Sequence, residues 1–523
     1  MDNEVIGGSH WEVILRMNRR HFIQTTFVGA GSFILPPSFF MTGCTAAGND
    51  APSTHDGQRY LFPDDHWIAG QSGVSRLFHP LTKEKDNPVI TKRTDEKNIG
   101  PYTFTWCNKQ PPYSAWFGSY KDDGSYPAYF VTSGDGMNWD SLRCENDALS
   151  IGDGNKQTAV LVRNTSGQFG YPYLGAQGLR HSPQSDTFHW RFIRSRDGIH
   201  WEFFPGEPIW EGPSDVLQII WDERKKKFVA YYKVWRYKGT TLEGKPFAAY
   251  GHLDTDIEGN VCRITGTTYL PKQTIDVKVQ YGGDTSNDGG GGRSDAKMQM
   301  ARVIGYAESS DFLHWEKEQI ILEPSSDAPL GDQSYGMGVF PYGNMYIGMY
   351  NHFNSLTGLL QPKLAWSYDG IHFTIREEQF FLTAGAAGEW DSGMVLAGEL
   401  MDAGNGQMYL YYGSLGVDHK NEDINQYHGA LGRAWLRRDG FASLKGGWIE
   451  TVPLKIHHKQ MSVNMTGVIG MTLKTAAGET MGETVLSGDH HNLIPDINLS
   501  AWIGKDVVVH LDLDKGELFS ITL

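Results

Sequence analysis

Four aspartates lie at positions where catalytic carboxyl groups would be expected. Asp215, Asp332 and Asp391 stand at or just before the starts of predicted strands, and Asp65 lies in an irregular segment near the start of the chain. Burying a carboxyl group at such a point costs free energy unless the group is used or paired. Two such groups can divide the work of a general acid and of a base or nucleophile. We expect Asp391 and Asp215 to form this pair, with Asp65 or Asp332 orienting a partner or raising its pKa.

Each aspartate also has a structural interpretation. Asp215 follows Pro213 and Ser214, and Asp332 follows a glycine, so both side chains could shape turns. Asp65 has Asp64 beside it, and one of the two could simply be solvated. The sequence leaves both interpretations open.

A second set of side chains could bind a ligand near the same strand starts. Aromatic rings offer flat platforms, while histidine and arginine offer hydrogen bonds and charge. In a β-rich protein, single aromatic and histidine residues are more often core than site. No contiguous oxygen-ligand loop supports a metal, and we expect no cofactor. The candidates are His66, Trp67, Arg180, His181, Tyr335, His352 and His428.

A repeated phrase indicates the elements that position these residues. Ser-x-Asp-Gly-x-x-Trp or a close variant begins at Ser133, Ser195, Ser309 and Ser367, with a degenerate copy at Arg437. Each copy follows an apolar run, as a strand entering a tight turn would. The aspartate can accept hydrogen bonds from backbone N–H groups, and the glycine can adopt the positive φ that a tight turn needs. The aromatic side chain can fill the gap between neighbouring sheets. Near-regular repeats of this kind predict a propeller.

The predicted fold is all-β, a five-bladed β-propeller followed by a small C-terminal β-sandwich. The propeller would span residues 60–446, with a long insertion at 237–300, and the sandwich-like tail would span 447–523. The 62 glycines and 16 tryptophans among 523 residues suit many tight turns and aromatic plugs. The glycine tract in the insertion lacks the lysine and helix start of a phosphate loop, so it predicts a surface loop.

Charge and cysteine content exclude two function classes. The formal net charge is −15, which leaves no basic stripe for nucleic acid. Cys107, Cys144 and Cys262 lack CxxC spacing, so they do not form a structural zinc site. We expect them to be buried thiols, with one disulfide as the alternative in an oxidising compartment.

The N-terminus has the features of an export signal. Arg19 and Arg20 open a twin-arginine pattern, and residues 27–40 form a short apolar run. The run ends near Cys44 in Met-Thr-Gly-Cys, which resembles a bacterial lipoprotein box. We therefore assign residues 1–44 to an extension and signal, and 45–59 to a linker. The expected location is the periplasm or outer membrane, with a lipid anchor at Cys44. The alternatives are a simple signal peptide with a chance cysteine, and a true start at Met17.

Several motifs together resemble a known class of bacterial proteins. They are the repeated phrase, the Asp-Ser-Gly-Met segment at Asp391, the Leu-Gly-Arg-Ala segment at Leu431, and the closing tail. This combination is similar to five-bladed propeller proteins grouped with glycoside hydrolase families 32 and 43. The resemblance implies a sugar-cleaving propeller. The Trp-x-Asn-Asp-Pro-Asn-Gly, Arg-Asp-Pro and Glu-Cys segments of family 32 are absent, so the resemblance does not identify the nucleophile.

The expected function is therefore hydrolysis of a glycosidic bond in an oligosaccharide. Glycoside cleavage uses two carboxyl groups that flank the scissile bond. The alternatives are a carbohydrate-binding propeller without catalysis, and a lyase or dehydratase acting on uronates. The lyase would depend on His181, His352 or His428 with Arg180 and a tyrosine.

Overall fold

The computed structural model describes most of the chain after residue 57. The described residues are 58–92, 98–99, 105–109, 111–120, 128–143, 156–180, 188–258, 261–268, 274–280, 298–325, 328–329, 331–419 and 429–523. The predicted signal, linker and lipid anchor at Cys44 lie outside them, as do Cys144, His181 and His428. Within these ranges no helix is long and apolar enough to cross a membrane.

The described residues form an all-β protein, in which the only helical turns are two short 3₁₀ segments, Gln168–Gly170 and Ser500–Trp502. The first two groups of strands are antiparallel five-stranded sheets. Group 1 contains β7 (Thr105–Asn108), β8 (Tyr113–Tyr120), β9 (Ala128–Ser133) and β10 (Asp140–Arg143), with β6 (Asn98–Ile99) also paired to β8. Group 2 contains β11 (Lys156–Arg163), β12 (Tyr173–Arg180), β13 (Phe188–Ser195) and β14 (Trp201–Phe203), with β15 (Ile209–Trp210) also paired to β13.

Three further groups follow the same pattern. Group 3 contains β16 (Leu217–Asp222), β17 (Lys227–Thr240), β21 (Met298–Ser309) and β22 (Glu316–Leu322). Group 4 contains β23 (Asp332–Tyr342), β24 (Met345–Asn354), β25 (Leu360–Ser367) and β26 (Thr374–Phe380). Group 5 contains β27 (Met394–Asp402), β28 (Gln407–Leu415) and β29 (Ala430–Arg437). Its outer strand β29 pairs with β4 (Thr82–Lys83) and β5 (Ile90–Thr91), which precede group 1 in the chain.

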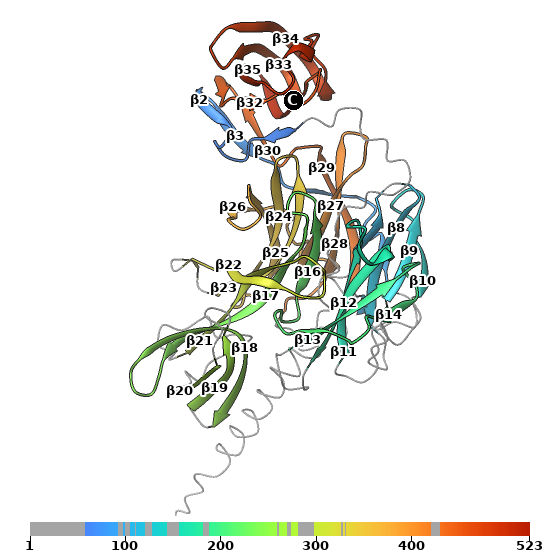
Figure 1. The fold of residues 1–523 in the computed structure, drawn as a ribbon, viewed down its shortest axis with the longest axis vertical. Helices are drawn as coiled ribbons and strands as arrows, with labels where there is room; N and C mark the ends of the chain where they lie inside the picture. Colours follow the sequence, from blue (N-terminus) through green and yellow to red (C-terminus); the bar gives the residue numbers. More distant parts are fainter. Residues whose placement is uncertain are drawn as a thin grey trace, which may run out of the picture.

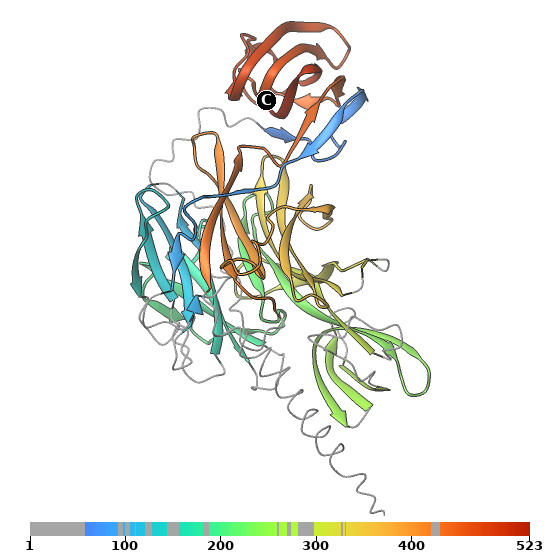
Figure 2. The same cartoon turned by 180° about the vertical axis from the view of Figure 1, so that it is seen from behind.

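The predicted insertion continues the sheet of group 3. Its strands are β18 (Pro246–Glu258), β19 (Val261–Thr268) and β20 (Thr274–Gln280), and β18 pairs with the far end of β17. Figures 1 and 2 show this arm projecting from one end of the molecule, while the last sheet lies at the other end.

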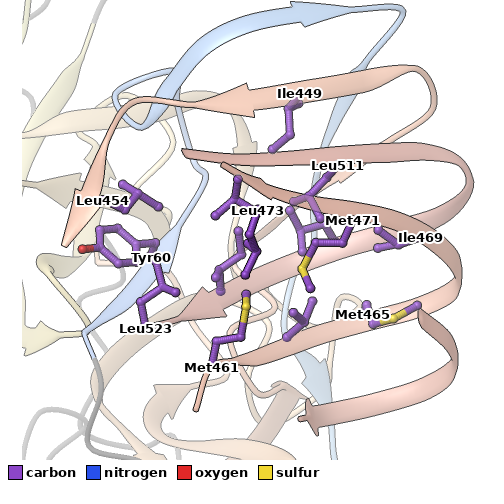
Figure 3. Close-up of a cluster of buried hydrophobic side chains, with 14 of the residues drawn as sticks. Tyr60, Ile449, Leu454, Met461, Met465, Ile469, Met471, Leu473, Leu511 and Leu523 are labelled. Carbon is purple, nitrogen blue, oxygen red and sulfur yellow. The ribbon is translucent and has the colours of Figure 1, made fainter. Parts of the chain in front are cut away.

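The last sheet takes strands from both ends of the described chain, which the sequence did not indicate. It curls around an apolar core that includes Leu473 and Leu511 (Figure 3). Its strands are β1 (Arg59–Leu61), β2 (Ile68–Ser72), β3 (Ser75–Phe78), β30 (Ala442–Lys445), β31 (Trp448–Thr451), β32 (Leu454–Lys455), β33 (Ser462–Thr475), β34 (Thr480–Leu493) and β35 (Asp506–Thr522).

The repeated phrase forms the turn that its residues predicted. In the second copy, Asp197 Oδ1 accepts hydrogen bonds from the backbone N–H groups of Ile199 and His200, both at 2.8 Å. Gly198 has φ 78°, in the region that favours glycine. The closing Trp201 is buried and donates its indole N–H to Gly198 O at 3.2 Å. The prediction of a strand followed by an Asx-type turn is confirmed.

Aromatic contacts join each group to the next and the last group to the first. The aromatic side chain comes from a strand, and its partner lies in the neighbouring group's repeated turn. Four contacts are hydrogen bonds and one is a ring contact. They are Trp116 to Gly198 O (2.7 Å), Phe192 to Phe312 (ring centroids 5.3 Å), Tyr231 to Gly370 O (2.8 Å), Tyr342 to Asp439 (2.5 Å) and Tyr411 to Gly136 O (2.5 Å).

The contact between the last and first groups gives a direct stability prediction. We expect Tyr411→Phe to lower the free energy of unfolding by about 1 kcal/mol, because Gly136 O loses the Tyr411 hydroxyl and keeps the Trp139 indole N–H at 3.2 Å. Urea unfolding of the full chain measures the change. Tyr409→Phe is the matched control, since among the described residues the Tyr409 hydroxyl bonds only to Gln407 and Asn405 of its own hairpin region. Equal effects of the two substitutions would contradict a closing role for Tyr411.

The degenerate fifth copy of the phrase has a different role. Asp439 is buried, and its carboxylate accepts hydrogen bonds from Tyr342 OH (2.5 Å), Ser520 Oγ (2.5 Å) and Asn464 Nδ2 (3.2 Å). Arg59 Nη1 lies 3.3 Å away. These partners come from group 4 and from three strands of the last sheet. Asp439 therefore fastens the last sheet to groups 4 and 5.

Candidate functional site

The starts of three first strands meet in one apolar cluster. Val216, Tyr335 and Met394, from the starts of groups 3, 4 and 5, belong to the same set of buried contacting residues. A parallel bridge pairs Leu360 with Met394 and joins groups 4 and 5 at this end. A Cβ added at Gly336 would lie 2.8 Å from Val216 Cγ1, so groups 3 and 4 approach closely here. The predicted aspartates Asp215, Asp332 and Asp391 flank this cluster in sequence.

Asp215 forms a buried ion pair. It lies two residues before β16, is 6% exposed, and pairs with Lys233 of β17, which is 3% exposed. Ser214 Oγ donates a hydrogen bond to Asp215 Oδ1 at 2.9 Å. Removing two charges from water is costly, and the pairing offsets that cost.

An arginine lies among aromatic rings beside this pair. The Arg302 guanidinium lies 4.6 Å from the ring centroid of Trp235, 5.1 Å from Tyr335 and 4.8 Å from Phe353. Its Nη1 donates to Gln333 Oε1 at 2.7 Å. Lys233 Nζ also lies over the Tyr335 ring, at 5.6 Å from its centroid. Cation–π contacts of this kind hold buried cations in place.

Tyr335 connects this cluster to group 5. The register of β23 against β24 shifts between Ser334 and Gly336, which sets Tyr335 off the regular ladder. Its hydroxyl lies 3.0 Å from Nε2 of His419, a residue just beyond β28. The predicted Tyr335 is therefore brought together with Asp215, through Lys233, and with a histidine that the sequence did not single out.

Asp332 and His352 form a second pair at the start of β23. His352 Nε2 lies 3.0 Å from Asp332 Oδ2, and Asn354 Nδ2 donates to Oδ1 at 2.8 Å. Burial alone would raise the pKa of Asp332, but the bonds from His352 and Asn354 outweigh it and lower this pKa. Asp332 is therefore suited to orient a substrate or to accept a hydrogen bond, rather than to act as a general acid.

Asp391 forms a third carboxylate pair. It is 3% exposed, and its Oδ2 lies 2.6 Å from Lys83 Nζ and 3.2 Å from the Tyr412 hydroxyl. Burial, followed by the charge of Asp391, raises the pKa of Tyr412. A Cβ at Gly385 would lie 2.1 Å from Asp391 Oδ1, so any larger residue there would collide with the carboxylate. Lys83 belongs to β4, so the chain before group 1 helps to hold Asp391.

The structure places the N-terminal candidates elsewhere. The side chain of Asp65 is 56% exposed; it pairs with Arg76 and accepts a bond from Gln71 at 3.0 Å. His66 stacks on Tyr368 at 3.8 Å between ring centroids, and Trp67 packs on the core of the last sheet. Tyr368 follows Ser367, whereas the strand-start cluster contains Leu360 at the opposite end of β25. Asp65, His66 and Trp67 are therefore not brought to the site.

Three further candidates have no described side-chain setting. Arg180 is the last residue of β12, and only its place in that strand is described. His181 and His428 lie outside the described residues. In the part of the chain that the structure describes, no group of three or more metal-ligating side chains could hold a metal ion.

Sequence reasoning missed the basic partners of the aspartates. Lys233 interrupts a buried run from Val229 to Val234, which is a signal that could have been used, because an unpaired lysine there would be costly. Arg302 is likewise a charged residue inside the apolar strand β21, which is the same kind of signal. The pairing of Lys83 with Asp391 joins residues 308 positions apart and leaves no local pattern.

Comparison with known proteins gave structural matches only. No family model and no curated protein matches the chain. Similar solved structures include a glycoside hydrolase family 43 arabinoxylan arabinofuranohydrolase from Bacillus subtilis, with 11% identity over 85% of this chain and 99% of that one, TM-score 0.37. An N-acetylgalactosamine deacetylase from F. plautii has 12% identity over 70% and 96%, TM-score 0.40. A putative glycoside hydrolase from Parabacteroides distasonis has 12% identity over 68% and 97%, TM-score 0.39.

Proposed function

We propose that this protein is a carbohydrate-active enzyme that hydrolyses a glycosidic bond, built on a five-bladed propeller. The five described groups, each in contact with the next and the last with the first, support the blade count. We also propose that the C-terminal tail forms a sandwich-like domain that includes strands β1 to β3. The observation that carries the proposal is the repeated placement of Asp215, Asp332 and Asp391.

These three carboxylates occupy corresponding points in three successive groups. Each lies at or within three residues of the start of a first strand, and each faces a basic partner: Lys233, His352 or Lys83. The Asp215–Lys233 pair is buried, and the other two pairs are buried in part. Burying such pairs is costly, and repeating them at equivalent points is expected of a site rather than of a core. The corresponding points of groups 1 and 2, before Thr105 and before Lys156, lie outside the described residues.

The proposed roles follow from what glycoside cleavage requires. One carboxyl group must protonate the leaving oxygen, and the other must act as base or nucleophile. We assign these roles to Asp391 and Asp215, and the one that acts as acid would exchange its lysine contact for a proton when substrate binds. Asp332, with its lowered pKa, would orient the substrate or a partner carboxyl. Lys83 and Lys233 would position the two catalytic carboxylates.

A second candidate function rests on the Tyr335–His419 contact. A tyrosine and a histidine 3.0 Å apart can serve as an acid–base pair, and the nearby Arg302 and Lys233 could offset the charge of a uronate. This arrangement would suit an elimination reaction. It uses His419 in place of the histidines that the sequence suggested.

Product masses from an oligosaccharide panel test both candidates. Hydrolysis adds one water to the products, whereas elimination does not. We expect hydrolysis products, and we expect their formation to be lost in Asp391→Asn but retained in His419→Ala. Products without added water, lost in His419→Ala, would favour elimination. Saturable sugar binding without any product would instead indicate a non-catalytic carbohydrate-binding propeller.

We also propose that the chain is exported and anchored by lipid at Cys44. This rests on the N-terminal motif alone. Incorporation of labelled fatty acid in cells, compared between the natural chain and Cys44→Ala, tests it.

A further inference from the structure

An exposed tryptophan lies on the outer face of the last sheet. Trp448 in β31 is 39% exposed, although its neighbour Ile449 is fully buried in the core beneath. Its ring stacks beside that of His510 in β35, with centroids 5.3 Å apart and planes at 28°. The contact with His510 fixes the orientation of the indole, so the ring is a supported surface rather than a freely rotating side chain.

A glycine lies beside the edge of the ring. Gly70 pairs with Glu450 across the ladder, and a Cβ built at Gly70 would lie 3.6 Å from the edge of the Trp448 ring. Any larger side chain at position 70 would extend over the indole. Because β2 is the edge strand of this part of the sheet, nothing beyond Gly70 in the described sheet covers the ring.

Polar side chains surround the ring on the same face. Ser72 and Asp512 are the cross-strand partners of Trp448 in β2 and β35, and both are exposed. Glu450 lies two residues along β31, where it bonds to Lys474 Nζ at 2.8 Å. A flat indole flanked by hydroxyl and carboxylate acceptors matches a sugar ring, which offers a C–H face for stacking and hydroxyl groups at its rim.

We propose that Trp448, with Ser72, Glu450 and Asp512, forms a second carbohydrate-binding site that takes a neutral sugar unit of a polysaccharide chain. The Asp512 carboxylate and the overall charge of −15 disfavour an acidic sugar, whereas Lys474 offsets the charge of Glu450. The site lies on the last sheet, at the end of the molecule away from the arm (Figure 1). It rests on the proposed carbohydrate function and would hold a polymer while the strand-start site acts on it.

Affinity electrophoresis of the full chain tests this site. The native gels contain arabinoxylan, mannan or polygalacturonate, and migration is compared with a gel that lacks polysaccharide. We expect at least one neutral polysaccharide to retard the protein, and polygalacturonate not to do so. Trp448→Ala should weaken the binding by about tenfold, whereas Trp448→Phe should retain part of it. Ile503→Ala is the control, because Ile503 is 52% exposed and apolar but lies in the loop between Ser500–Trp502 and β35.

The outcomes separate this site from the proposed hydrolase. Retardation by neither neutral polymer, equal retardation of Trp448→Ala and the parent, or binding of polygalacturonate alone would overturn the second site. Cleavage of short oligosaccharides by the parent protein is measured on the same preparations. Cleavage without Trp448-dependent retardation would leave the hydrolase proposal standing and remove the second site. Trp448-dependent retardation without any cleavage would support the second site and remove the hydrolase proposal.

Discussion

Asp215→Asn is expected to lower the rate of oligosaccharide cleavage by about a thousandfold or more. Asparagine keeps the shape of the side chain and an acceptor for Ser214, but it supplies neither a proton nor a negative charge to the substrate. Steady-state kinetics on the best substrate of the panel measure the loss. Asp65→Asn is the control, because Asp65 is exposed on the last sheet and should leave the rate unchanged.

Stability must be separated from catalysis in this experiment. Asp215→Asn leaves Lys233 buried with its charge unpaired, and breaking a buried pair costs about 3–5 kcal/mol. Replacing both partners, as Asp215→Leu with Lys233→Met, should recover most of the stability but none of the activity. If the double variant regained cleavage, or if the single variant lost stability but remained active, Asp215 would be a structural residue only.

Asp439→Ala is expected to lower the free energy of unfolding by about 3–5 kcal/mol. The substitution removes the acceptor for Tyr342, Ser520 and Asn464 and leaves the Arg59 charge without its partner. Because these residues come from separate sheets, the loss should also loosen the last sheet from groups 4 and 5. Urea unfolding measures the first effect, and proteolysis near residue 440 detects the second.

The matched control is the same position in another copy of the turn. The side chain of Asp369 is 50% exposed, and in the part of the chain that the structure describes it bonds only within its own turn, to Ile371, His372 and Ser367. Asp369→Ala should therefore cost only about 1 kcal/mol. An effect at Asp369 as large as that at Asp439 would contradict the fastening role.

Acid titration gives a second readout for Asp439. Burial would raise the pKa of Asp439, but Arg59, Ser520 and Tyr342 together lower it from 3.8. A carboxyl group whose folded pKa is depressed stabilises the protein above its unfolded pKa, and this contribution is lost as the pH falls through the folded pKa. The stability difference between the natural chain and Asp439→Ala should therefore shrink below about pH 4.

The sequence predicted best what depends on neighbouring residues. The Asx-type turns were predictable because Asp197, Gly198 and Trp201 act within one short segment. The aspartates at strand starts were also visible, since each precedes an apolar run. Their partners were not, because the pairing of Lys83 with Asp391 depends on how β4 aligns with β29. The placement of Asp65 was mistaken for a similar reason: the short strands β1 to β3 join a sheet completed only by the end of the chain.

The pairing of β4 and β5 with β29 has a consequence for how the chain acquires its structure. Lys83 meets Ala434 and Ile90 meets Leu431, so the outer edge of group 5 needs segments about 350 residues apart. Closing so long a loop costs conformational entropy before any stabilising contact forms. Because of this cost, topologies of this kind fold slowly. During synthesis, the segment around residues 82–91 has no partner until nearly the whole polypeptide has emerged. That interval leaves unpaired strand edges open to wrong association, and it makes the nascent chain a natural client for chaperones.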